Sequence, residues 1–326
     1  LKFKEINDVP IYHEEVRVYE VYEKNDDFLA LFYIDLHPRE TKNGGAWMTT
    51  FRPQGLFAGK VERPLISIVG NLTPSSEEKP SLLTYREVET IFHEFGHALH
   101  GMLSNVTYSS LASPDVYWDF VELPSQIMEN WLGEPEVLRS FAKNYETGEA
   151  IPESYIEKIK DMANYGSANM GLGQTSYALI DMLWHTTDPA TISSVADIED
   201  KVHEMCSFYP ERSRTMSTAF GHLFSGGYAS GYYGYKWAEV LDADVYEEFK
   251  RNGLYDQDTA KRLVDTIYSR GGQIDPMELF KQMMGREPDP SALYRREGLI
   301  ANDNQEQDPT AAPEYDVDQD APQYMP

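Results

Sequence analysis

The residues best suited to chemistry are His93 and His97, which lie four positions apart with Glu94 directly after the first of them, in the pattern H-E-x-x-H. Residues i and i+4 of an α-helix lie on one face, so both imidazoles can direct a ring nitrogen at one metal ion. The pattern is typical of zinc peptidases, in which the glutamate is the general base. A match this short arises from composition alone in about one chain in a hundred of this length. The identity of a third ligand therefore has to show whether the pattern is a metal site.

A third histidine at the spacing H-E-x-x-H-x-x-G-x-x-H is ruled out, because Leu103 occupies its place and His100 stands where the glycine is expected. The other common solution takes a carboxylate from a second helix and leaves one coordination position open for water. Glu122 and Glu129 are the candidates, and their separation of seven residues places them on one helical face. Pro124 predicts a helix start or a kink beside Glu122.

The histidines require a helix, and the sequence predicts one over residues 84–101. Thr84 and Glu87 fit the capping box at its start, and Gly101 is a plausible stop at its end. Apolar residues recur at helical spacing away from the two histidines, at positions 88, 91, 95, 98 and 102. We therefore expect a helix deep in the core that presents one polar stripe to a cavity.

The rest of the chain is predicted to be mainly helical, with one small sheet near the N-terminus. Alternating or apolar runs predict three or four mostly antiparallel strands at 16–22, 28–36, 46–51 and 65–72. Helical patterns then follow at 120–132, 134–146, 153–170, 174–186, 195–207, 228–252, 258–269, 276–284 and 290–297. The fold class is mainly α (α+β).

Composition excludes several classes of partner. The 326 residues carry a formal charge of −26, which argues against binding to nucleic acid or to an anionic membrane surface. No apolar run is long enough to predict a membrane span. The single cysteine, Cys206, makes an internal disulfide impossible and allows a reducing compartment, so a cytoplasmic location is expected. The chain begins at Leu1, which suggests a fragment and leaves a periplasmic location open.

Two segments together resemble the thimet oligopeptidase family of zinc metallopeptidases: HEFGHALHGM at 93–102 and DFVELPSQIMENW at 119–131. The resemblance implies a zincin-like catalytic domain with one zinc ion (Zn2+) per chain, held by His93, His97 and Glu122. It also implies that Glu94 is the general base and that Glu129 supports the ligands from behind. His100 is expected to line the cavity or to support the ligands, because two histidines and a glutamate already fill the protein's share of the coordination.

A third segment, GHLFSGGYASGYYGYKW at 221–237, resembles the Gly- and Tyr-rich substrate loop of the same family. His222 precedes Tyr228 by six residues and Tyr235 by thirteen, which is similar to the bacterial peptidyl-dipeptidase and oligopeptidase A branch. By this resemblance these three residues are catalytic. Tyr232, Gly226 and Gly227 are expected to contact the substrate. If the segment is helical, Tyr228 and Tyr235 share a face and can direct their hydroxyls at the oxyanion of the reaction.

The resemblance covers residues 1–299, which we expect to form a zinc metallopeptidase domain. Full-length members of the family carry a further N-terminal half, which is absent here. That half is expected to complete the substrate channel, and residues 300–326 to form an acidic disordered tail. The expected function is zinc-dependent hydrolysis of short peptides, with release of C-terminal dipeptides. One alternative is cleavage of internal bonds, and another is a catalytically silent zinc-binding domain. Trp118 and Trp131, which flank the Glu122 segment, are interpreted as core residues.

Overall fold

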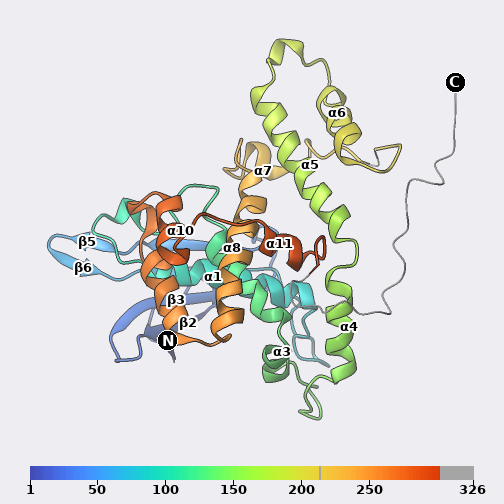
Figure 1. Ribbon diagram of the computed structural model, residues 1–326. Helices are drawn as coiled ribbons and strands as arrows, with labels where there is room; N and C mark the ends of the chain where they lie inside the picture. Colours follow the sequence, from blue (N-terminus) through green and yellow to red (C-terminus); the bar gives the residue numbers. More distant parts are fainter. Residues whose placement is uncertain (213, 302–326) are drawn as a thin grey trace, which may run out of the picture.

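The N-terminal part of the chain is a five-stranded sheet, seen in a computed structural model that describes residues 1–212 and 214–301 (Figure 1). Its strands follow the spatial order β1 (Lys2–Ile6), β2 (Arg17–Tyr22), β3 (Phe28–Asp35), β7 (Leu65–Val69) and β4 (Trp47–Arg52). All neighbours are antiparallel except β3 and β7, which run parallel. A separate hairpin is made by β5 (Gly55–Phe57) and β6 (Lys60–Glu62).

The four predicted strands are confirmed, and β1 is an addition. Four of the five residues of β1 are exposed, and three of them are charged, so the strand carries little of the apolar alternation that predicts a strand. It is held instead by backbone pairing with β2, in which Lys2 lies opposite Tyr22 and Ile6 opposite Val18.

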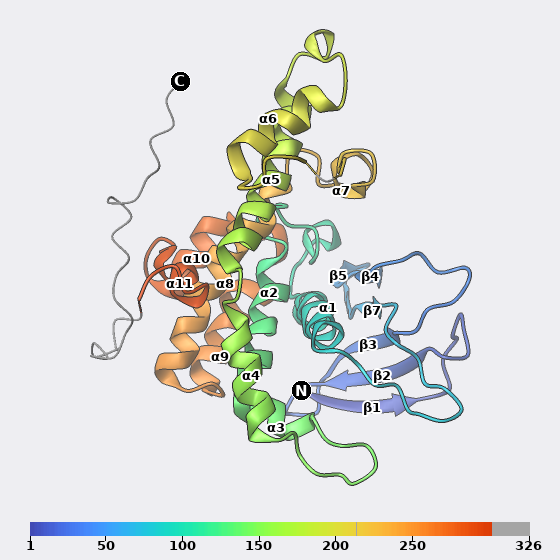
Figure 2. The same ribbon diagram turned by 90° about the vertical axis from the view of Figure 1, so that its right-hand side faces the viewer.

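Helix α1 (Tyr85–Leu103) lies between the sheet and the remaining helices (Figure 2). Its predicted start is confirmed: the Glu87 backbone N–H donates to Thr84 Oγ1 over 3.3 Å, and the Thr84 N–H donates to Glu87 Oε2 over 2.8 Å. The predicted stop at Gly101 is wrong, because the helix continues to Leu103. Gly101 is instead a contact point with the sheet, where a Cβ would stand 2.7 Å from Ile66 Cδ1.

Two apolar clusters fix α1 from opposite sides. Ala98 and Met102 pack against the sheet, where they meet buried residues of β2, β3 and β7. On the other side, buried residues of α2 (Leu123–Glu129) pack with those of α8 (Tyr233–Asn252) and of the segments that follow it. These segments are α9 (Gln257–Leu263), the π-helical turn η4 (Val264–Tyr268) and α10 (Pro276–Met284). The metal-site helix is thus held rigidly in the core.

The remaining helices lie around this body. Short turns η1 (Ser109–Leu111), η2 (Asn130–Gly133), η3 (Pro189–Thr191) and η5 (Gly271–Gln273) join the longer elements. The helices not yet named are α3 (Pro135–Phe141), α4 (Glu153–Ala163), α5 (Ser167–Thr186), α6 (Ala196–Cys206), α7 (Gly221–Phe224) and α11 (Ser291–Arg296). The upper part of α5 projects from the body together with α6 (Figures 1 and 2).

Three helix predictions are wrong at their ends. The predicted helix over 153–170 is two helices, because Gly166 adopts a left-handed φ of 72° and α5 begins after it. The helix predicted over 134–146 ends at Phe141, and the one predicted over 228–252 begins at Tyr233. Within the described residues no helix combines the length and the apolar character needed to cross a membrane. The predicted acidic tail lies outside the described residues from residue 302 onward.

Candidate active site

The site depends on an unusually close contact between α1 and α2, which Gly96 makes possible. A Cβ at Gly96 would lie 2.2 Å from the carbonyl oxygen of Pro124 and 2.6 Å from Ser125 Cα. Only a residue without a side chain allows the two helices to approach in this way. Glu122 is the N-cap residue of α2, directly before Leu123, so the contact brings it to the histidine face of α1.

His93, His97 and Glu122 converge as a set that could hold one metal ion. Glu122 Oε2 lies 3.2 Å from His93 Nε2 and 3.2 Å from His97 Nε2, and the three ligand atoms lie within 4.8 Å of one another. Glu122 is buried, and both histidines are partly buried. Two imidazoles and one carboxylate are the donor set of catalytic zinc sites with an open coordination position, so the residues fit a zinc ion.

The electrostatics of the three ligands are strongly coupled. Burial lowers the pKa of His93, but hydrogen bonds to Glu122 and Glu129 outweigh this and raise that pKa to about 10. Burial raises the pKa of Glu122, but its hydrogen bonds to His93 and His97 bring that pKa well below its usual value. The carboxylate is therefore ionised at neutral pH, and a cation bound here would replace a proton on His93.

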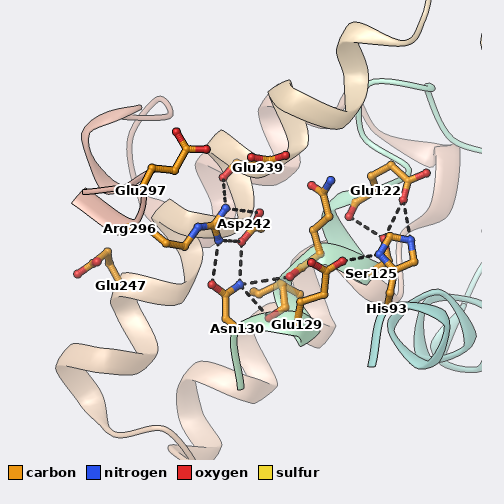
Figure 3. A network of polar contacts seen from close by, with 12 residues as sticks. His93, Glu122, Ser125, Glu129, Asn130, Glu239, Asp242, Glu247, Arg296 and Glu297 are labelled. Atoms are coloured by element: carbon orange, nitrogen blue, oxygen red, sulfur yellow. Dashed lines mark hydrogen bonds and ion pairs between the residues drawn. The ribbon is translucent and has the colours of Figure 1, made fainter. Parts of the chain in front are cut away.

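Glu129 holds the far side of His93, where its Oε1 lies 2.5 Å from Nδ1 (Figure 3). With Nδ1–H donated to this carboxylate, Nε2 faces Glu122 and the candidate metal position, and in the metal-free chain it donates its proton to Glu122. The next residue, Asn130, donates to Asp242 Oδ1 of α8 over 2.7 Å. Asp242 in turn pairs with Arg296 of α11. The adjacent residues Glu129 and Asn130 therefore connect His93 on one side with α8 and α11 on the other.

Two further residues of α1 are buried without complete hydrogen bonding. Glu94 is 7% exposed, its Oε2 has no hydrogen-bond partner, and burial raises its pKa. A raised pKa makes the carboxylate a stronger base. His100 is fully buried with neither ring nitrogen hydrogen-bonded, and burial lowers its pKa to about 3. Its ring meets the edge of Tyr268 at 6.0 Å and makes no hydrogen bond to the ligands.

The tyrosines of the Gly- and Tyr-rich segment gather over the ligands. The rings of Tyr228 and Tyr235 stack with centroids 4.8 Å apart, and the His222 ring lies 5.5 Å from the first and 5.9 Å from the second. Tyr232 lies 5.1 Å from Tyr235 and donates its hydroxyl to Gln174 of α5 over 3.0 Å. All three tyrosine pKa values are raised, chiefly by burial, so the hydroxyls remain protonated donors.

One of these hydroxyls connects the two halves of the site. Tyr228 donates a hydrogen bond to Glu122 Oε1, while the other oxygen of that carboxylate faces the histidines. Tyr228 precedes α8, so the shared helix face does not bring it to Tyr235. A turn does so instead, in which the Gly231 N–H donates to the Tyr228 carbonyl over 2.7 Å and Ser230 adopts a φ of 57°.

The interpretation of Trp118 as a core residue is wrong, because its side chain is 49% exposed. Its ring lies 4.6 Å from the Tyr228 ring and covers Gly227, where a Cβ would stand 3.1 Å from the indole. Gly227 also has a φ of 84°, so this position requires glycine for two reasons. Gly226 lies over α7, with a Cβ position 3.1 Å from His222 Cα. Trp131, in contrast, does pack against the main apolar cluster.

Comparisons with known proteins identify the family of the chain. The model of "Peptidase family M3" matches residues 1–299. Oligopeptidase A of Salmonella typhimurium is 39% identical over 300 residues, which are 91% of this chain and 44% of that protein. The Arabidopsis thaliana protein named "Probable cytosolic oligopeptidase A" is 39% identical over 90% of this chain and 43% of its own. Dipeptidyl carboxypeptidase of Escherichia coli is 36% identical over 92% and 44% respectively.

This chain therefore spans less than half the length of the curated relatives it matches. Among solved structures, one described as "BsuCP Crystal Structure" aligns with a TM-score of 0.49 and 13% identity, over 83% of this chain and 54% of that chain. That likeness is too distant to bear on function.

Proposed function

The chain belongs to peptidase family M3, and from that premise we propose that it hydrolyses peptide bonds in short peptides with one zinc ion. Residues 1–299 act as the catalytic domain. The observation that carries the proposal is the convergence of His93, His97 and Glu122, with ligand atoms within 4.8 Å of one another. The buried Glu94 follows His93 directly on α1, and the Tyr228 hydroxyl donates a hydrogen bond to Glu122.

The bound zinc ion would supply a Lewis acid that polarises a carbonyl oxygen and activates water. Glu94 acts as the general base and returns its proton to the leaving amine. Its raised pKa supports this role, because a carboxyl group with a pKa nearer neutrality both accepts and releases a proton efficiently. Glu129 fixes the His93 tautomer through Nδ1. His100 supports the ligand helix from the core and takes no part in proton transfer.

The tyrosine hydroxyls stabilise the negative charge that develops on the carbonyl oxygen of the scissile bond. Tyr228 and Tyr235 stay protonated because their pKa values are raised, so Tyr235 can donate a hydrogen bond to this oxygen, and Tyr228 can do so when its hydroxyl turns from Glu122. His222 packs edgewise on the Tyr235 ring and orients it. Tyr232, Gly226 and Gly227 contact the backbone of the bound peptide, and the glycines let the segment close over it.

The favoured mode is release of dipeptides from the C-terminus, and cleavage of internal bonds is the alternative. One relative is named dipeptidyl carboxypeptidase and another oligopeptidase A. Mass spectrometry of the products separates them. Stepwise loss of dipeptides that stops when the peptide is C-terminally amidated supports the first mode, and larger internal fragments support the second.

Glu94→Gln tests the catalytic proposal. It keeps the size of the side chain but removes the base, so we expect one bound zinc ion per chain and a fall in kcat of about 100-fold or more. The control is Glu157→Gln, an exposed glutamate on α4, which should leave turnover unchanged. If the wild-type chain binds zinc and shows no turnover, or if Glu94→Gln changes nothing, the chain is a zinc-binding domain without catalysis of the proposed kind.

The natural partner of this chain is the segment that the relatives carry beyond the matched region, and we propose that it closes the substrate channel. The identities span 44% of the Salmonella typhimurium protein, which supports a protein longer than the domain described.

We place the protein in the cytoplasm, with the periplasm as the alternative. The single cysteine and the name of the Arabidopsis thaliana relative support the cytoplasm. Neither nucleic acid nor a membrane surface is a partner, because the net charge is −26.

A further inference from the structure

A buried carboxylate on α5 holds the backbone of the tyrosine segment. Asp181 is fully buried, and its Oδ1 and Oδ2 each accept a backbone N–H over 3.0 Å, from Ser230 and Tyr232 respectively. Burying a charge is costly unless it is well hydrogen-bonded. An apolar residue here would avoid that cost, so the carboxylate has a specific task in ordering the chain it binds.

The two bonds lie at the point where the segment changes direction. Ser230 has a φ of 57°, a left-handed conformation that a non-glycine residue adopts only when its surroundings hold it there. Tyr228 lies two residues before this point and Tyr235 three residues after Tyr232. The carboxylate therefore fixes the one stretch of backbone that sets both catalytic tyrosines relative to each other.

Two other residues of α5 support this arrangement. Gln174 accepts the Tyr232 hydroxyl over 3.0 Å, and it lies seven residues before Asp181, so both are on one face of the helix. His185 Nδ1 lies 2.8 Å from the Asp181 carbonyl oxygen and 3.0 Å from its Oδ1. The carboxylate is thus oriented from its own helix while it binds the segment opposite.

We propose that Asp181 is a positioning residue that ties the tyrosine segment to α5 and thereby sets the Tyr228 hydroxyl against Glu122. Asp181 then couples the position of α5, a helix that projects from the body, to the positions of Tyr228 and Tyr235. The structural part of this proposal stands alone, and only its catalytic consequence rests on the proposed function.

Hydrogen–deuterium exchange of the zinc-loaded chain tests the structural part without any need for activity. Asp181→Asn keeps the shape of the side chain but replaces one acceptor oxygen with an amide that cannot accept. We expect exchange at residues 228–232 to become about tenfold faster or more, because a charge-assisted bond to a backbone N–H is lost. The sheet peptides 28–35 and 65–69 should keep their slow exchange, which shows that the chain is folded.

The matched control is Glu199→Gln on α6. Glu199 is also buried and its Oε1 also accepts two backbone N–H groups, from Met216 and Ser217, but these lie outside the tyrosine turn. It should speed exchange at 215–218 and leave 228–232 unchanged. Asp181→Glu keeps the charge but displaces the acceptors, and it replaces Asp181→Asn if that variant does not fold. Unchanged exchange at 228–232 in the folded Asp181 variant overturns the proposal.

A double-mutant cycle with Tyr228→Phe tests the catalytic consequence. Asp181→Asn should lower kcat/KM for a short peptide about tenfold in the wild-type background, and less than threefold when Tyr228 already lacks its hydroxyl. Equal falls in the two backgrounds would show that Asp181 does not act through Tyr228. If the wild-type chain cleaves no peptide, the proposed function fails, whereas the exchange experiment still decides whether Asp181 holds the segment.

Discussion

Replacing Gly96 with alanine should damage the metal site more than any other single methyl group added to α1. The new Cβ would stand 2.2 Å from the Pro124 carbonyl oxygen, whereas ordinary contacts of a Cβ begin at 3.4 Å. The three nearest atoms all belong to the backbone of α2, so no side chain can rotate out of the way. The overlap can be relieved only if α2 moves away from α1 by about 1 Å.

That movement carries Glu122 away from the histidines, since Glu122 is the N-cap residue of α2. Zinc ligands keep their distances to about 0.2 Å, so a shift of about 1 Å removes the carboxylate from coordination. Loss of an outer partner of a ligand weakens metal binding by about 10–100-fold, and loss of the ligand itself should exceed this. Overpacking costs about 1–3 kcal/mol of stability, which outweighs the gain of about 1 kcal/mol from the higher helix propensity of alanine.

The assay is competition for zinc against a chelator of known affinity, together with thermal unfolding of the chelator-treated chain. Gly171→Ala is the control, because Gly171 lies within helix α5 and a Cβ there meets nothing within 4 Å. It should raise the unfolding temperature slightly and leave zinc affinity unchanged. If Gly96→Ala binds zinc within twofold of the wild-type chain, the close approach of α1 and α2 does not set the ligand geometry.

Three other predictions concern paired charges. Glu129→Gln should weaken zinc binding about 10–100-fold in the same competition assay, because it removes the carboxylate 2.5 Å from His93 Nδ1. Unchanged zinc affinity would show that Glu129 does not orient His93. Burial lowers the His93 pKa, but hydrogen bonds to Glu122 and Glu129 raise it from 6.5 to about 10. Protonated His93 therefore stabilises the folded metal-free chain, and this contribution to the free energy of unfolding is lost as the pH rises from 6.5 through 10. Zinc competes with that proton, so its apparent Kd should fall about tenfold per pH unit between pH 7 and 9, and a flat titration refutes the linkage. Lys42→Met should lower the free energy of unfolding by about 1.5–3 kcal/mol in chemical denaturation, because Asp35 loses the ammonium 2.7 Å away but keeps the Arg39 guanidinium at 2.8 Å.

Sequence reasoning succeeded where a feature depends on neighbouring residues. The capping box at Thr84 and the shared face of His93 and His97 are both local consequences of one helix, and the structure contains both. Strands β2, β3, β4 and β7 follow from alternating or apolar runs in the same way. The edge strand β1 carries almost no apolar signal, so only its partner β2 determines that it is a strand.

What depends on contacts between distant segments could not be predicted. Gly101 has the residue type of a helix stop, but it is needed for the approach of Ile66. Gly96 occupies a variable position of the metal pattern, and nothing in the sequence indicates that α2 lies against it. Trp118 is apolar in sequence, yet it covers an exposed glycine turn. Asp181 has no motif at all, and only the bonds to Ser230 and Tyr232 reveal its part.

The packing of α2 also determines when this site can exist during protein synthesis. Leu123 and Ile127 of α2 are buried by residues of α8, η4 and α10, more than a hundred positions further along the chain. A ribosome adds about 5–20 residues per second, so the histidines of α1 precede that core by several seconds. We expect a nascent chain that ends before Tyr233 to leave α2 without its apolar partners and Glu122 without a fixed position. The candidate site is then completed only after the residues of α8, η4 and α10 have left the ribosome.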